Sequence, residues 1–436
     1  MNTLNLLCFL LLLVLPLRLA SKQYSDGFED GVFKVQETND EDSNGSKKAT
    51  SNVDAFGAKG DGVSDDTKAF VNAWKKACSK QGSSIFLVPK GKRYLVSATK
   101  FKGPCAGMLT IQIEGTIVAP DDIETWDPDF PRMWLGYYNL SNVSFEGKGV
   151  IDGSGSKWWA ASCKRNKSNA LTIDSSSSVN VKDLTIRNAQ QMHFIIGRSD
   201  SVRVSGVTIS APGDSPNTDG IHVTGSTNVV LQDCKIGTGD DCISIVSESS
   251  NIKMKNIYCG PGHGISLGKD NSTGMVEKVV LDNAFIRDTT NGLRIKTWQG
   301  GSGYVRSMRY QNVRMENVSN PIIIDQFYCD SPSKCEDQAS AVEVSEIFYK
   351  NITGTSATRI TMKFACSDAM PCSNIILSNI NMQSEDDDEE TYCNNASSFI
   401  CGRVHPSADC LLSSALQERE GVVEDSFSQH IIHTEL

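Results

Sequence analysis

The feature that most constrains this chain is a short motif that recurs along its middle. Segments of the form apolar-x-x-apolar-x-apolar begin at 181, 204, 231, 254, 281 and 310, so successive starts are 23, 27, 23, 27 and 29 residues apart. The segments are rich in Val and Ile, with Asn, Gly and Asp at their ends, as in strands bounded by turns. A repeat of this length is typical of solenoids. It predicts an all-β, right-handed parallel β-helix with one coil per repeat.

One segment near the N-terminus departs from this pattern. Residues 64–78 begin with a Ser/Asp cap and continue with the apolar stripe of an amphipathic helix. The stripe consists of Ala69, Phe70, Ala73, Trp74 and Ala77. We expect this short helix to cover the open first coil.

The two ends of the chain differ from its repetitive body. Residues 1–20 are an apolar run interrupted by a proline and an arginine and followed by no second apolar span, which favours a secretory signal over a membrane anchor. Residues 21–51 are interpreted as a polar leader or propeptide. Residues 52–410 are interpreted as one β-helix domain, and residues 411–436 as a divergent tail.

The formal net charge of −10 is concentrated in a few segments. Residues 21–50, 384–390 and 411–436 carry −3, −6 and −4, which leaves the rest of the chain slightly positive. Acidic segments of this kind are usually solvated. The body of the protein is therefore able to accept an anion.

The 14 cysteines indicate an oxidising compartment. Zinc-type spacing is absent, so disulfides are favoured over a metal framework. Close pairs are Cys242/Cys259, Cys329/Cys335 and Cys366/Cys372. Removing Cys8 with the signal leaves an odd number, and thus at least one unpaired thiol. Eight N-x-S/T triplets also fit secretion, at Asn44, Asn139, Asn142, Asn166, Asn271, Asn317, Asn351 and Asn395.

Four segments of the body share a frame in which a polar residue is followed two and four places later by apolar ones. They begin at Asp219, Asp241, His263 and Asn291, with spacings of 22, 22 and 28 residues. Equivalent positions on neighbouring coils of a parallel β-helix lie about 4.8 Å apart. The first three of these side chains should therefore form a ladder, with Asp240 beside it.

Alternation along the same strands turns a second set of polar side chains outward, among them Arg294 and Lys296. Three carboxylates, an imidazole and two cations thus converge on one face. Carboxylates this close oppose full ionisation, so one should keep its proton above the ordinary Asp pKa of about 3.9. The alternatives are an Asp pair that only caps a turn, and a calcium site. Calcium cages, however, need several oxygen ligands and gain nothing from neighbouring cations.

The motifs around these residues resemble those of the plant polygalacturonases. Four match in order, namely SPNTDGIH (215–222), GTGDDCISI (237–245), CGPGHGISLG (259–268) and RIK (294–296). Two more are VDAFGAKGDGVSDDTKAF (53–70) and IIIDQFYCD (322–330). The resemblance spans roughly residues 52–410. It implies a right-handed parallel β-helix and inverting hydrolysis of α-1,4 bonds between galacturonates.

The resemblance also implies catalytic roles. Asp240 is similar to the family's general acid, and Asp219 and Asp241 are similar to the pair that activates water. His263 would support the protonation of the acid and contact the sugar. An inverting pair needs room for a water, about 6.5–9.5 Å between carboxyl groups, which neighbouring coils and side-chain splay can supply.

Substrate contacts are implied in the same way. Arg294 and Lys296 would hold a substrate carboxylate, a task for which the guanidinium fork is well suited. Tyr328 and Asn217 would also contact the sugar. We expect pectin or polygalacturonate as the partner, no cofactor or metal, no nucleic acid, no membrane contact after signal removal, a monomer, and secretion to the cell wall.

Other functions on the same scaffold remain open at this point. A pectate lyase would cleave the same polymer with calcium and an Arg base, and a silent wall-binding protein would show a broken ladder. Rhamnogalacturonan hydrolases are a nearer alternative, but they generally lack the full NTD and RIK set. The stretch 163–174 is shorter than the plant pattern and lacks its second cysteine, which would leave Cys163 unpaired.

Overall fold

The computed structural model describes residues 48–411, with gaps at 125, 127–132, 162–167, 269–272, 330–335, 337 and 385–387. The predicted signal, most of the predicted leader and the predicted tail after its first residue lie outside the described residues, as do Cys8, Cys163, Cys335, Asn44, Asn166 and Asn271. The other five N-x-S/T asparagines are exposed. No helix in the described part of the chain has the length and hydropathy needed to cross a membrane.

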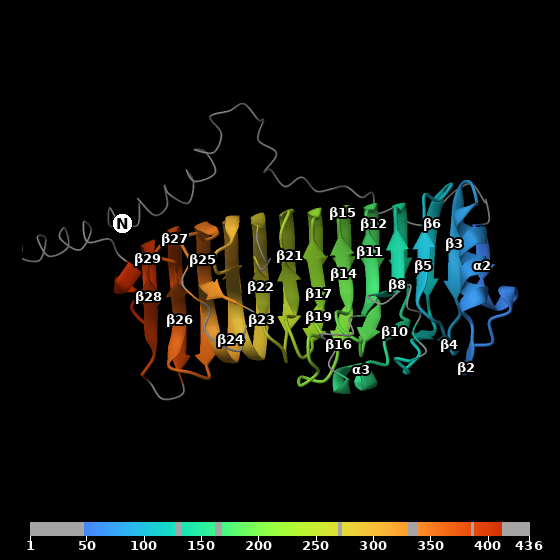
Figure 1. Ribbon diagram of the computed structural model, residues 1–436, viewed down its shortest axis with the longest axis horizontal. Coiled ribbons are helices and arrows are strands. Elements are labelled where there is room, and N and C mark those ends of the chain that lie inside the picture. The colour runs from blue at the N-terminus through green and yellow to red at the C-terminus, as the bar shows by residue number, and fades with distance from the viewer. Residues whose placement is uncertain are drawn as a thin grey trace, which may run out of the picture. The chain divides into compact units, whose positions relative to one another are not determined.

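The strands wind into a solenoid whose coils lie side by side along one axis (Figure 1). Neighbouring coils pair in parallel, as between β12 and β15 or β14 and β17. These pairings build three parallel sheets, which confirms the predicted β-helix. The strands of the first sheet are β1 (Ala49–Asn52), β3 (Ser83–Val88), β6 (Met108–Ile113), β9 (Ser141–Glu146), β12 (Ser177–Lys182), β15 (Asp200–Ser205) and β18 (Thr227–Gln232).

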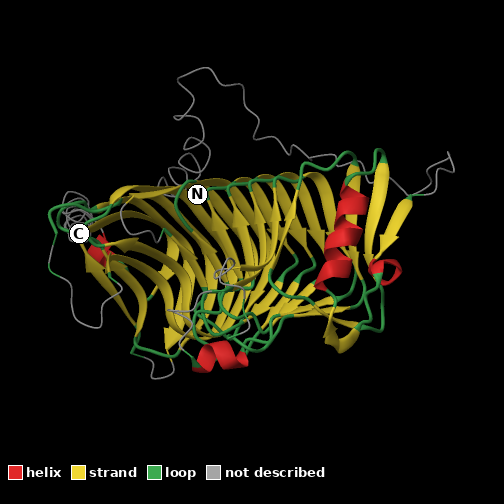
Figure 2. Ribbon diagram, turned by 45° about the vertical axis from the view of Figure 1, so that its right-hand side comes forward, coloured by secondary structure: helices red, strands yellow, loops and turns green. Residues whose placement is uncertain are grey.

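Two further sets of paired strands form the second and third sheets, and the strands of successive coils follow one another in Figure 2. The second contains β2 (Asp61–Asp65), β4 (Arg93–Leu95), β7 (Thr116–Val118), β10 (Val150–Asp152), β13 (Thr185–Arg187), β16 (Thr208–Ser210) and β19 (Lys235–Gly237). The third contains β5 (Thr99–Lys102), β8 (Met133–Tyr138), β11 (Asn169–Asp174), β14 (Phe194–Gly197), β17 (Ile221–Thr224), β20 (Ile243–Ile245), β22 (Ile265–Leu267), β26 (Ile360–Ala365) and β28 (Glu390–Asn394).

Later strands continue around the corners and take part in more than one sheet. They are β21 (Ser249–Cys259), β23 (Thr273–Trp298), β24 (Ser302–Tyr328), β25 (Glu343–Ser356), β27 (Cys372–Ser384) and β29 (Ala396–His405). For example, β23 pairs with both β21 and β22. Short helices α3 (Ser156–Ala160) and η2 (Asp409–Leu411) complete the described elements together with η1 (Val53–Phe56) and α2 (Thr67–Cys78).

The repeated sequence motif corresponds to a corner rather than to a single strand. In the copy at 231–236, Leu231 belongs to β18 and Ile236 to β19, and both are fully buried. Between them Asp233 has a φ of +54°, a left-handed conformation that Asn and Asp tolerate better than most residues. This residue turns the chain, so the apolar residues on either side both reach the core.

Asparagines occupy the same corner in later coils and bond to one another along the solenoid. We call Asn256, Asn283, Asn312, Asn351 and Asn379 the corner asparagine column; each has a φ between +52° and +58° or, for Asn283, of +63°. The Nδ2 of Asn283 donates to Asn256 Oδ1 at 2.8 Å, and that of Asn351 donates to Asn312 Oδ1 at 3.1 Å. The column satisfies side-chain polar groups at a bend that every coil must make.

The predicted capping helix is confirmed as α2, which lies beside β3 at the N-terminal end of the solenoid (Figure 1). Its buried residues are the five of the predicted stripe. Its cap differs from the prediction, because the side chain of the N-cap residue Asp66 does not bond to the first turn of the helix. It accepts from the amides of Lys59 and Gly60 at 2.7 and 3.1 Å. The side chain of Asp65 accepts a hydrogen bond from the amide of Thr67 at 2.9 Å.

The first strand begins earlier than the predicted domain. The predicted leader extends to residue 51, but β1 pairs with β3 over its whole length, from Ala49↔Ser84 to Asn52↔Leu87. The segment is polar, yet its backbone bonds are those of a regular coil. Hydropathy does not mark this boundary because a strand at the end of a sheet is held largely by its backbone.

Four disulfides join described cysteines. They are Cys78–Cys105, Cys242–Cys259, Cys366–Cys372 and Cys393–Cys410, so two predicted pairs are confirmed. Cys329 is also disulfide-bonded, but its predicted partner lies outside the described residues. Among the cysteines that the structure describes, the free thiol is that of Cys234. It is buried at the inward corner position, where it packs as a small apolar residue.

Candidate active site

The predicted ladder forms on the third sheet. Pairing of Ile221 with Ile243, and of Ile243 with Ile265, sets β17, β20 and β22 in register. Asp219 and Asp241 each precede the first residue of their strand by two positions, and so does His263. The spacing of 22 residues therefore equals one full coil at this place.

The outward row of the same strands is also as predicted. His222, Ser244, Ser266 and Arg294 are partners in successive pairings. The two serines, which the sequence did not single out as site residues, bond to the carboxylates. Ser244 Oγ donates to Asp219 Oδ2 at 3.0 Å, and Ser266 Oγ donates to an oxygen of the next Asp in the ladder at 2.8 Å. The signal for them was the same alternation that placed Arg294.

Asp241 is the most enclosed of the three site carboxylates, with a side-chain exposure of 2%. Arg294 Nη2 lies 2.9 Å from its Oδ1, and Lys296 Nζ lies 2.7 Å from its Oδ2. Arg294 Nε also donates to Ser266 Oγ at 2.9 Å. The two cations compensate a charge that would be costly to bury alone. The residues predicted to hold a substrate carboxylate are thus fixed in place by a carboxylate of the protein.

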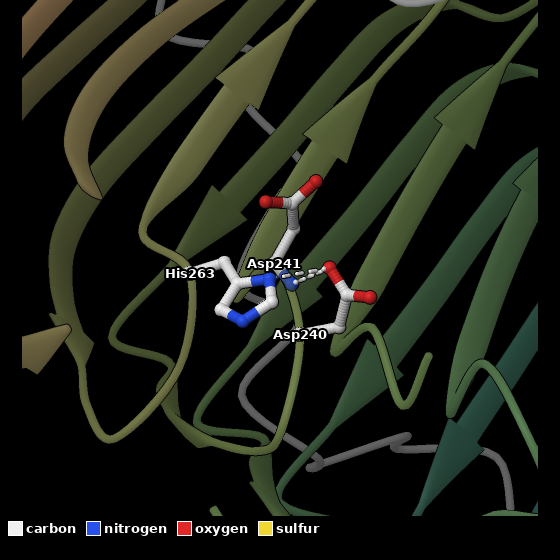
Figure 3. Close-up of side chains that lie close together, drawn as sticks. All are labelled: Asp240, Asp241 and His263. Carbon is white, nitrogen blue, oxygen red and sulfur yellow. Dashed lines mark hydrogen bonds and ion pairs between the residues drawn. The ribbon is translucent and has the colours of Figure 1, made fainter. Parts of the chain in front are cut away.

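Asp240 lies on the other side of the turn and is held by three donors. His263 Nδ1 is 3.0 Å from its Oδ1, and the amide of Asp241 donates to the same oxygen at 2.8 Å (Figure 3). Asn217 Nδ2 donates to Oδ2 at 3.2 Å. Asn217, predicted to contact the sugar, therefore bonds to the predicted acid in this structure.

The site carboxyls differ in their affinity for protons. Burial, followed by the negative charges of Asp240 and Asp241, raises the pKa of Asp219 well above its ordinary value. Burial opposes ionisation of Asp240 too, but the hydrogen bond and charge of His263 and the charge of Lys296 outweigh it and lower its pKa to about 2. The raised pKa that we expected for one carboxyl therefore falls on Asp219, whereas the pKa of the predicted acid, Asp240, is lowered.

The reason for this difference lies in the hydrogen-bond donors. Asp240 accepts from an imidazole, a main-chain amide and a side-chain amide, all of which favour the anion. Asp219, which is 8% exposed, accepts one hydrogen bond, from the hydroxyl of Ser244. The sequence reveals the three carboxylates but not this unequal distribution of donors.

The turn residues that carry the acids are tied to one another across coils. The amide of Gly239 donates to Thr218 Oγ1 at 3.0 Å, and a Cβ at Gly239 would lie 1.9 Å from Ser215 O. Glycine is therefore required for this approach. The disulfide Cys242–Cys259 joins the turn residue that follows Asp241 to the last residue of β21. These links fix the site on rigid elements.

One ligand atom each of Asp240, Asp241 and His263 lies within 4.8 Å of the others. The two carboxyls are thus nearer than the roughly 6.5–9.5 Å of a typical inverting pair, because they are consecutive residues. A hard cation is poorly suited to this group, since both oxygens of Asp241 already accept from cations. We keep the absence of a metal as a prediction.

Tyr328, at the end of β24, completes the predicted set. Its ring centroid is 5.7 Å from Lys296 Nζ and 6.0 Å from the ring of Trp298. Seven of the eight residues predicted for the site are therefore joined by hydrogen bonds, ion pairs or a cation–π contact. The eighth, Asp219, lies close enough for the charges of Asp240 and Asp241 to raise its pKa.

Comparison with known proteins places this site in a family. The model of glycosyl hydrolases family 28 matches residues 78–402. A probable polygalacturonase of Arabidopsis thaliana is 43% identical over 92% of this chain and 93% of its own length. A polygalacturonase of Persea americana is 45% identical over 85% of this chain and 82% of its own length.

Solved structures share the fold at lower identity. The polygalacturonase of Erwinia carotovora superposes with a TM-score of 0.66 at 22% identity, covering 77% of this chain and 94% of the other. Endopolygalacturonase I of Stereum purpureum gives a TM-score of 0.60 at 20% identity, covering 77% and 98%. The match of the family model over most of the chain, with relatives of 43–45% identity, shows that this protein belongs to glycosyl hydrolases family 28 and is a glycoside hydrolase.

Proposed function

We propose that this protein is a secreted polygalacturonase that hydrolyses α-1,4-galacturonosyl bonds of pectin with inversion, in the modification of the plant cell wall. The observation that carries the proposal is the combination of three carboxyls and an imidazole with Arg294 and Lys296 on one face. An acid and a base are needed for hydrolysis of a glycoside, and the two cations suit a polymer with a carboxylate on every sugar. Relatives named polygalacturonase support the same substrate.

The proton for the leaving group comes, in this proposal, from the pair of Asp240 and His263. Protonated His263 beside ionised Asp240, and neutral His263 beside neutral Asp240, differ only in the position of one proton along a 3.0 Å contact. Movement of that proton from Nδ1 to Oδ1 makes Asp240 a neutral acid. Asp240 can then protonate the glycosidic oxygen as the bond to the anomeric carbon breaks.

Asp219 and Asp241 act on the attacking water in this proposal. Because its pKa is raised, Asp219 is the stronger base once it has lost its proton. Asp241 keeps Arg294 and Lys296 in place. These two cations attract the substrate carboxylate, and Tyr328 contacts the sugar. The water adds to the face of the sugar opposite the leaving oxygen, so the anomeric configuration is inverted.

The direct test uses purified protein, de-esterified polygalacturonate and no added calcium. We expect new reducing ends, insensitivity to EDTA, and an α-linked substrate that first yields the β-anomer by NMR. Product lengths then distinguish endo from exo cleavage. A calcium requirement with unsaturated products would instead identify a lyase, and cleavage of only rhamnogalacturonan would identify the nearer alternative.

The rate should depend on pH as a bell centred in mildly acidic solution. As pH falls, Asp219, whose pKa is raised, is protonated early and water activation is lost. As pH rises, the fraction of Asp240 that carries a proton falls, and the acid function with it. The two limbs belong to the coupled cluster rather than to single residues. A rate measured from pH 3 to 9 that still increases above pH 8 would contradict the proposed acid.

Arg294→Lys tests the role assigned to the guanidinium. Lysine keeps the positive charge beside Asp241, but it cannot bond to Ser266 and Asp241 together while presenting a planar fork. We expect KM for polygalacturonate to rise by about tenfold or more, equivalent to 1.4 kcal/mol, with little change in Tm. Exposed Arg203, which bonds to Gln232, offers Arg203→Lys as the matched control with unchanged KM.

A further inference from the structure

A second histidine lies directly behind the site and takes no part in the chemistry above. His193 is fully buried and immediately precedes β14, in the coil before that of Asp219. Phe194 pairs with Ile221, so the two neighbouring turns run side by side. The main-chain amide of His193 donates to the carbonyl oxygen of Asp219 at 2.8 Å, and the ring Nδ1 of His193 lies 3.0 Å from the same oxygen.

The hydrogen-bond partners determine the tautomer of this ring. The amide of Ala189 donates to His193 Nε2 at 3.3 Å, and an amide N–H cannot accept, so Nε2 carries no proton. The proton of the neutral ring is therefore on Nδ1, which donates to the Asp219 carbonyl. Burial lowers the pKa of His193 to about 4, against the opposing effect of nearby main-chain carbonyls, so the ring is neutral in mildly acidic solution.

Asp219 is consequently held at both ends. Its carbonyl oxygen accepts two donors from His193, one from the main chain and one from the ring. Its carboxyl accepts Ser244 Oγ at 3.0 Å. Ser244 thus orients the carboxyl of Asp219, while His193 on the neighbouring coil fixes the main chain of the same residue.

We propose that His193 is a positioning residue for hydrolysis, which holds the main chain of Asp219 so that its carboxyl meets the attacking water at the productive distance. The inference rests on the proposed function of Asp219. His193 itself does not touch the substrate, because its ring is completely buried. A shift of about 1 Å in a catalytic group can cost about 10²-fold in rate, so one lost bond behind the base is sufficient to matter.

Three substitutions separate the ring's two hydrogen bonds. Asparagine at 193 can place an amide N–H where Nδ1 stands and keep the bond to the Asp219 carbonyl. Glutamine can place its oxygen near the position of Nε2 and keep the bond from Ala189. Phenylalanine fills the volume and keeps neither. We expect kcat on polygalacturonate to fall by about 10²-fold in His193→Phe, with KM within about twofold, and to recover largely in His193→Asn but not in His193→Gln.

The control for packing is Phe194→Leu, which alters the next residue, also fully buried. We expect it to lower Tm while leaving kcat near wild type. The low-pH limb of the rate profile should also shift in the glutamine variant and not in Phe194→Leu, since only the former disturbs Asp219. If His193→Phe does not fold, the comparison of asparagine with glutamine at similar Tm still decides the question.

Normal kcat in a folded His193→Phe, or equal kcat in the asparagine and glutamine variants, would overturn the proposal. Wild-type protein is assayed in parallel. If it is inactive on polygalacturonate, that result counts against the proposed function and not against the hydrogen bond between His193 and Asp219. In that case ¹⁵N NMR of the ring still tests the positioning bond: a proton on Nε2 instead of Nδ1 would refute it.

Discussion

Replacing Asp240 with asparagine is expected to lower kcat on polygalacturonate by about 10²–10⁴-fold, the range that general acid catalysis contributes. Asparagine has the shape of aspartate, but it cannot take a proton from His263 and pass it to the leaving oxygen. Its side-chain oxygen can still accept the amide of Asp241, which donates to the wild-type carboxylate at 2.8 Å. Folding should therefore survive, and Tm and circular dichroism should change little.

The control for this variant is Asp233→Asn, at a corner remote from the ladder. Asp233 accepts Asn256 Nδ2 at 2.7 Å, a bond that asparagine can also accept. This variant should retain wild-type kcat. Near-normal kcat in Asp240→Asn, measured under the same conditions, would show that another group supplies the proton.

Asp219→Asn is expected to reduce kcat by about 10²-fold or more and at the same time to stabilise the protein at neutral pH. The folded pKa of Asp219 lies above its unfolded value, so the folded state binds a proton that the unfolded chain releases. Its contribution to the free energy of unfolding therefore declines as pH rises from the unfolded pKa of about 3.9 through the folded value. Asparagine removes that decline and should raise Tm at pH 7 by about 2 °C or more.

The gain in Tm should shrink toward zero as pH falls below about 4, because the wild-type carboxyl is then neutral in both states. Asp200→Asn provides a control of opposite sign. Hydrogen bonds from Ser201 and Thr227 lower the pKa of Asp200, so its substitution should decrease Tm at pH 7 without affecting kcat. An Asp219→Asn protein that is less stable than wild type at pH 7 and at pH 4 alike would contradict the raised pKa.

The ladder is predictable because it depends on counting alone. In a parallel β-helix one coil returns the chain to the same face, so a spacing of 22 residues is enough to bring Asp219, Asp241 and His263 together. The same counting positions Arg294 in the outward row. The helix α2 follows from its apolar stripe, since that periodicity differs from the one of the strands.

Other properties of the site depend on distances that no pattern contains. Asp219 and Asp240 are the same residue type, so the sequence gives them the same expected pKa. They differ in the number of hydrogen-bond donors around them, which contributes to the raised pKa of Asp219 and the lowered pKa of Asp240. His193 falls in a loop without a repeat signature, and its relation to Asp219 arises only when two coils stack. Cys234 occupies an apolar position of the motif, but the sequence alone does not identify it as unpaired, as it is among the described cysteines.

The corner asparagine column has a consequence for how proteins of this shape can change in length. Since each coil bends at the same kind of residue and bonds only to the coils next to it, the energy of the stack is close to a sum over neighbours. A whole coil gained or lost far from Asp240 would leave both new neighbours with corners of the same kind, able to bond across the new junction. The length of the solenoid can thus vary by whole turns while the residues of the site stay unchanged.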